Sequence, residues 1–146
     1  MNISKSLLFF IGIVAIVALG VFFFRYKALG TEYEDYQTIP LSKAPEPIQT
    51  KYSNTKANTG YYSYLEDNTS YVLINMGEVN TGGYKVEIEK VLKSEDKWTI
   101  KAKFIEPGPN DIVIQVISYP ATVVKIPEKV NNVNVIADGK KLLKLN

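Results

Sequence analysis

The sequence predicts an all-β domain, a small antiparallel sandwich or partly open barrel, preceded by one transmembrane helix and a stalk. Three observations predict this arrangement. Residues 7–24 are apolar without interruption, the next segment is rich in proline and polar residues, and the remainder alternates apolar and polar residues with a period of two. Period two is typical of strands with one buried face. We therefore divide the chain into a leader (1–6), a transmembrane anchor (7–24), a linker or stalk (25–58) and a β domain (59–146).

The apolar run at 7–24 carries no charged or polar side chain. As a helix it would span about 27 Å, close to the thickness of a bilayer core. The alternative is a cleaved signal peptide, whose apolar core is about 7–15 residues long. Residues 28–30 (Ala-Leu-Gly) resemble a cleavage site, but Arg25 and Lys27 separate them from the run. We expect an uncleaved signal anchor in the cell membrane, single-pass, with the carboxyl-terminal domain extracytoplasmic.

The segment 25–58 shows little apolar periodicity and contains Pro40, Pro45 and Pro47. A flexible chain of this length reaches about 30 Å, which would lift a domain clear of the lipid. Its tyrosines either dock on the domain or lie at the lipid headgroups. These residues are Tyr33, Tyr36 and Tyr52.

The β domain contains several runs of strand character. Two of them, 84–91 and 97–106, alternate cleanly and are separated by a polar turn, which predicts an antiparallel hairpin. Asp138-Gly139 between apolar residues predicts a second, two-residue hairpin. The predicted strand runs are 70–76, 84–91, 97–106, 111–118, 121–127 and those within 132–145.

Composition excludes several classes of chemistry. The chain has no Cys and no His, so a Cys/His zinc site and a Ser-His or Cys-His nucleophile are excluded. Lysines and acidic residues are equal in number over residues 61–146, which argues against nucleic-acid binding. We expect no enzymatic activity, no cofactor and no metal. A hydrolase of unknown type is a remote alternative.

A glycine-rich turn stands between two strand runs, in the stretch GEVNTGGYKVEIEKV at 77–91. Gly82 and Gly83 allow a tight turn, or they let another backbone come very close. The plain interpretation is a hairpin turn, and the functional one is an exposed loop that touches a partner. The candidate partner-binding residues here are Asn80, Thr81, Gly82, Gly83 and Tyr84.

Two proline sites supply the other candidate binding residues. Pro107-Gly108 predicts a turn, and Pro109 stiffens its exit, so this loop either connects strands or forms a rigid contact that loses little entropy on binding. Tyr119-Pro120 predicts an edge, bulge or corner, because proline cannot donate to a sheet ladder.

In combination these motifs resemble the carboxyl-terminal domain of the PrcB family of bacterial protease complex subunits. The similarity covers roughly 71–127, about two fifths of the chain. It implies an extracytoplasmic, non-catalytic role, because the founding member is associated with an extracellular protease that it helps to stabilise. The matching positions are Gly77, Thr81, Gly82, Gly83, Tyr84, Pro107, Gly108, Pro109, Tyr119 and Pro120.

Residues 80–84 (Asn-Thr-Gly-Gly-Tyr) also resemble the Asn-Pro-Thr-Thr-Gly-Tyr loop of chagasin-type peptidase inhibitors. No proline follows Asn80, and that family's two later loops are absent. We expect a membrane-anchored protein-binding module whose partner is a protein, with an extracellular or membrane protease as the first candidate. The alternatives are a peptidase inhibitor that uses the 80–84 loop and a structural envelope protein without a specific partner.

Overall fold

The computed structural model describes residues 5–28, 30–95 and 97–146, and within the first helix it describes the side chains of residues 10–24. The predicted leader at 1–6 lies outside the described residues except for its last two, which begin the helix.

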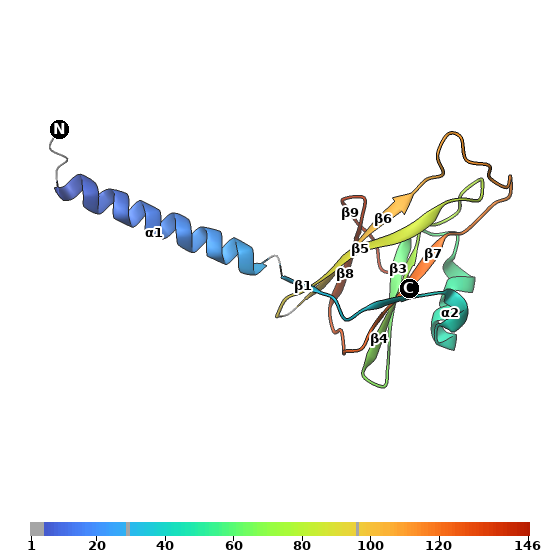
Figure 1. Cartoon of the computed structure of the whole chain (residues 1–146). Helices are drawn as coiled ribbons and strands as arrows, with labels where there is room; N and C mark the ends of the chain where they lie inside the picture. The colour runs from blue at the N-terminus through green and yellow to red at the C-terminus, as the bar shows by residue number, and fades with distance from the viewer. Residues whose placement is uncertain (1–4, 29, 96) are drawn as a thin grey trace.

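Helix α1 (Lys5–Ala28) projects away from the β domain (Figure 1). Its apolar side chains are uncovered, from Phe10, which is 70% exposed, to Phe24, which is 80% exposed. Among the residues whose side chains are described, no helix is both long enough and apolar enough to cross a membrane.

The β domain is a sandwich of two sheets, and in the described part of the chain these sheets do not close into a barrel. Strands β6 (Trp98–Ile105) and β8 (Val133–Ala137) pair in parallel, which makes the first sheet mixed and corrects the expectation of an antiparallel fold. In order across the sheet, the first contains β1 (Thr31–Tyr33), β5 (Lys85–Lys93), β6 (Trp98–Ile105), β8 (Val133–Ala137) and β9 (Lys140–Lys141). The second contains β2 (Gln37–Ile39), β7 (Ala121–Ile126), β4 (Thr69–Asn75) and β3 (Gly60–Glu66).

Local sequence signals explain most of these strands. The predicted hairpin is confirmed as the antiparallel pair β5–β6. The turn at Asp138-Gly139 is confirmed between β8 and β9, with φ of 49° and 76°. Asp67 and Asn68 form a similar turn between β3 and β4, also with positive φ, because short polar side chains tolerate this region.

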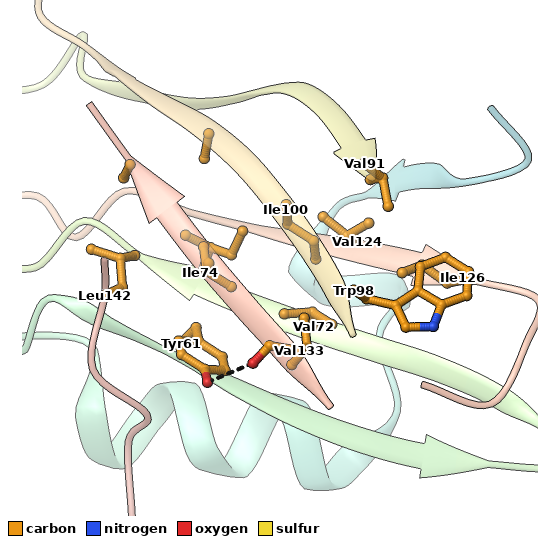
Figure 2. Packing of buried hydrophobic residues seen from close by; sticks show 13 residues of the cluster. Tyr61, Val72, Ile74, Val91, Trp98, Ile100, Val124, Ile126, Val133 and Leu142 are labelled. Atoms are coloured by element: carbon orange, nitrogen blue, oxygen red, sulfur yellow. Dashed lines mark hydrogen bonds between the residues drawn. The ribbon is translucent and has the colours of Figure 1, made fainter. Parts of the chain in front are cut away.

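The core lies between the two sheets and consists mainly of aliphatic side chains (Figure 2). Val72, Ile74 and Ile100 are fully buried there. Tyr61 is also buried, and its hydroxyl donates a hydrogen bond of 2.9 Å to the Val133 carbonyl, which links β3 of one sheet to β8 of the other. A second cluster lies on the outer face of the second sheet, under helix α2 (Glu46–Thr55).

The prediction of a stalk at 25–58 needs correction, because most of this segment belongs to the folded domain. It supplies β1, β2, the short 3-10 helix η1 (Leu41–Lys43) and α2 (Glu46–Thr55). Ile48 of α2 is fully buried. Three-residue strands and one short helix are too brief for a periodic pattern, so sequence reasoning missed them.

The tyrosines of this segment dock on the domain. The Tyr33 ring meets the Trp98 ring edge-on at 4.9 Å between centroids. Tyr36 packs against the main core, and the Tyr52 hydroxyl donates to the Tyr119 carbonyl at 2.8 Å.

Residues 111–118 were predicted to be a strand, and this prediction is wrong. They form an irregular chain with a bend at Val116, and only Ser118 makes a bridge, to Val79. The aliphatic run that suggested a buried strand is largely exposed.

Candidate functional site: a ribbon with an aliphatic face

Two segments far apart in sequence, 76–84 and 106–120, pair beyond the end of the β4–β7 ladder. We call them together the ribbon. The last regular pair of the ladder is Asn75 with Ala121. Beyond it, both segments stay linked by backbone hydrogen bonds of 2.9 Å. These bonds run from Met76 N–H to Pro120 O, in both directions between Val79 and Ser118, and from Gly82 N–H to Ile114 O.

The glycine pair permits this close approach. A Cβ on Gly83, where φ is +90°, would lie 2.9 Å from Val113 Cγ1 and 3.1 Å from Pro107 Cβ. A Cβ on Gly82 would lie 3.7 Å from the Ile114 oxygen, an ordinary contact. The close neighbour of Gly83 is therefore the chain's own second segment. On that side the glycine pair is closed to a partner.

The second segment carries an exposed aliphatic patch. Ile112 is 103% exposed, Ile114 73%, Val116 57% and Ile117 54%. Gln115 is the remaining exposed residue among them, so the stretch 112–117 contains no charge. We call the four aliphatic residues the ribbon patch. Contiguous exposed apolar surface of this kind marks interaction sites more often than ordinary protein surface does.

The proline loop braces the start of this segment. The Gly108 N–H donates to Asp111 Oδ2 at 2.7 Å, and the Asp111 N–H donates to the Gly108 carbonyl at 3.1 Å. Pro107 is half-buried against Gly83, whereas Gly108 and Pro109 are exposed. The predicted turn is thus present, and it fixes the chain just before Ile112.

Of the two predicted aromatic residues, Tyr119 lies near the base of the ribbon and is engaged within the fold. The Tyr119 hydroxyl donates to Glu78 Oε2 at 3.1 Å, and the Lys56 ammonium lies 4.7 Å from the Tyr119 ring centroid. The hydrogen bond to Glu78 raises the pKa of Tyr119 above its ordinary value of 10.0. Tyr84 is half-buried. Tyr119 therefore anchors the ribbon base.

The other predicted residues take the remaining ribbon positions. Asn80 is exposed and Thr81 half-buried, both in the first segment. Pro120 is half-buried, and its carbonyl accepts the Met76 hydrogen bond. The structure thus brings all ten predicted positions onto one ribbon. Sequence reasoning missed the ribbon patch, because the aliphatic run was interpreted as a buried strand.

The ribbon lies at the end of the domain opposite α1. Strand β1, which follows α1 closely, pairs with the last residues of β5, where Thr31 faces Lys93. The ribbon joins β5 at its other end, before Lys85. Figure 1 shows the 106–120 chain, in orange, at the side of the domain away from the helix. Among the described residues, no group of three or more acidic side chains is placed to hold a metal ion.

Comparison with known protein families matches the part of the chain that contains the ribbon. Residues 70–127 match the family model described as PrcB C-terminal, which confirms the resemblance over those residues and covers the whole ribbon. A further match is an uncharacterized protein of Methanocaldococcus jannaschii, 36% identical over 63 residues. That alignment covers 43% of this chain and only 38% of the relative's length. No solved structure matches the chain.

Proposed function

We propose that this chain is a non-catalytic accessory module that binds a protein, in first place a protease, through the ribbon patch, while residues 7–24 hold it at a membrane with the β domain extracytoplasmic. The observation that carries the proposal is the exposure of the four aliphatic side chains in a segment, 112–117, that contains no charged residue and is braced at its start by the proline turn. Branched apolar side chains that are held in place before contact lose little entropy on binding.

The match of residues 70–127 to the PrcB C-terminal model favours a protease as the partner class. The matched region includes both segments of the ribbon, so the family resemblance and the exposed patch coincide in one part of the chain.

The membrane part of the proposal is supported by helix α1. Its exposed side chains from Phe10 to Phe24 are apolar, and water is a poor environment for such a surface. A bilayer would cover them. With α1 in the membrane, the ribbon at the opposite end of the domain would point away from the lipid and toward a partner.

A site-specific crosslinking experiment tests the binding surface. A photo-crosslinking residue replaces Gln115, within the ribbon patch, and in a matched chain replaces Leu65, which is 43% exposed. Leu65 pairs with Ser70 near the far end of the β3–β4 hairpin, away from the ribbon. We expect a discrete protein adduct from position 115 in intact cells, and its loss in the double variant Ile112→Asp, Ile114→Asp.

Equal adducts from both positions, or an adduct that survives the double substitution, would contradict binding through the ribbon patch. Alkaline carbonate extraction tests the anchor separately, because an anchored chain stays in the membrane pellet. Release into the supernatant would contradict membrane anchoring and would leave the proposal of binding through the ribbon patch unaffected.

A further inference from the structure

We propose that residues 111–114 enter the substrate cleft of a peptidase that accepts branched aliphatic side chains, with Ile112 in its primary specificity pocket. This inference rests on the proposed function and names how the ribbon meets its protease. The segment acts as a competitive inhibitor that occupies the cleft through non-covalent contacts. If the peptidase cleaves the Ile112–Val113 bond with water, the reverse reaction re-forms the bond and releases the water.

The side chains of this segment alternate as they do in a bound substrate. Ile112 is fully exposed, Val113 turns inward against Pro107 and Gly83, and Ile114 turns outward again. Ile112 is therefore the most protruding side chain of the segment, and the adjacent Val113 packs against the fold.

Both ends of the segment are held by the fold. Asp111 is fixed on the proline turn through Gly108, and the Ile114 carbonyl is fixed by the Gly82 N–H. A segment held in place before binding loses less entropy when it binds. The same bonds would keep the two sides of the Ile112–Val113 peptide bond together if it were cut, which favours resealing over release.

The backbone of Ile112 and Val113 is free to form hydrogen bonds with a partner. Among the described residues, the N–H and C=O groups of Ile112 and Val113 take part in no hydrogen bond within the chain. Peptidases bind substrates by pairing with an extended backbone, as in strand addition, and the primary pocket selects one side chain. An uncharged, β-branched side chain at this position fits an elastase-like pocket and not a trypsin-like one, which requires a positive charge.

The resemblance to chagasin-type loops would place residues 80–84 in the peptidase cleft, whereas this proposal places residues 111–114 there. In the structure, Gly82 and Gly83 lie beside the second segment and support it. The protruding aliphatic side chain belongs to the 106–120 segment instead.

A specificity exchange tests the proposal. The purified full chain, in mild detergent, is titrated against neutrophil elastase and against trypsin with chromogenic substrates. We expect competitive inhibition of elastase by the wild type and none of trypsin. Ile112→Arg should weaken elastase inhibition by roughly 100-fold, because a charge would enter an apolar pocket, and should create trypsin inhibition. Leu65→Arg, at a position that is 43% exposed and lies away from the ribbon, is the control and should change neither value.

Absence of elastase inhibition by the wild type would overturn the proposal. So would inhibition that disappears within a few turnovers as the Ile112–Val113 bond is hydrolysed, or equal effects of arginine at positions 112 and 65. A ribbon-dependent adduct from position 115 in cells, together with no elastase inhibition, would reject cleft entry and retain the proposed function.

Discussion

The N–H of Gly82 donates to the carbonyl of Ile114 at 2.9 Å, across 32 positions of sequence. This bond joins the glycine turn and the proline loop, which the sequence presents as separate motifs, into one ribbon. It holds the aliphatic run of the second segment in solvent at the end of the sandwich.

Alanine substitution at the two adjacent glycines should affect the stability of the fold to different degrees. Gly83→Ala should destabilise the fold by about 1–3 kcal/mol, because φ of +90° is strained for alanine and its Cβ would meet Val113 at 2.9 Å. Gly82→Ala, whose Cβ would meet nothing nearer than 3.7 Å, should change stability by less than about 0.5 kcal/mol. Urea unfolding of both variants measures the difference, and equal costs would contradict the assigned roles.

Acid should weaken the contact between Lys93 and Glu128. The hydrogen bond from Lys93 holds the pKa of Glu128 below its ordinary value of 4.5. Because the folded-state pKa is the lower one, the contact stabilises the fold above about pH 4.5, and this gain is lost as the pH falls through the folded-state pKa.

Thermal melts between pH 3 and 7 measure this effect. Glu128→Gln should flatten the acid limb, by less than about 1 kcal/mol, since both side chains are partly exposed. Glu89→Gln, an exposed acid outside the ion pairs of the described residues, is the control. An acid limb that is unchanged in Glu128→Gln would show that this contact does not contribute.

Helix α2 should be required for folding of the β domain. Ile48→Ala should cost about 2–5 kcal/mol, because it leaves a cavity between α2 and the second sheet. Ile48→Val removes one methylene and should cost only about 0.5–1.5 kcal/mol. Equilibrium unfolding followed by circular dichroism gives both values. A negligible change in the free energy of unfolding for Ile48→Ala would show that α2 does not contribute to the stability of the β domain.

The hydroxyl of Tyr61 should contribute to the pairing of the sheets. Tyr61→Phe leaves the buried Val133 carbonyl without this donor and should cost about 1–2 kcal/mol. Tyr64→Phe removes a hydroxyl that has no hydrogen bond among the described residues, and should be within about 0.5 kcal/mol of wild type. The comparison needs only thermal denaturation of the two variants, and indistinguishable melts would exclude the role assigned to the hydroxyl.

Period-two alternation predicted β5 and β6, which each bury one face against the core. Short runs rich in β-branched residues predicted β4 and β7, which are buried on both faces. Turn chemistry predicted the β8–β9 hairpin at Asp138-Gly139. These signals are local, so they can be recognised without knowing which elements pair.

Composition misled the prediction in two places. Residues 31–55 are polar and contain prolines, yet β1, β2 and α2 pack on the sandwich through a few buried residues such as Ile48 and Ala44. Residues 112–117 are aliphatic, yet they lie in solvent. Burial depends on which surfaces meet, and composition alone does not give this.

The sequence by itself determined that the chain is mostly β, that it lacks imidazole and thiol chemistry, and that glycine and proline turns flank its central hairpin. Only the tertiary structure decided that these turns meet, that Gly83 lies against the second segment, and that Ile112 is the most exposed of the large hydrophobic residues described. The physical reason is that strand patterning is set by near neighbours along the chain, whereas the ribbon arises from contacts between residues 30 to 44 positions apart. The register of these contacts is fixed only when the two segments pair in the folded chain.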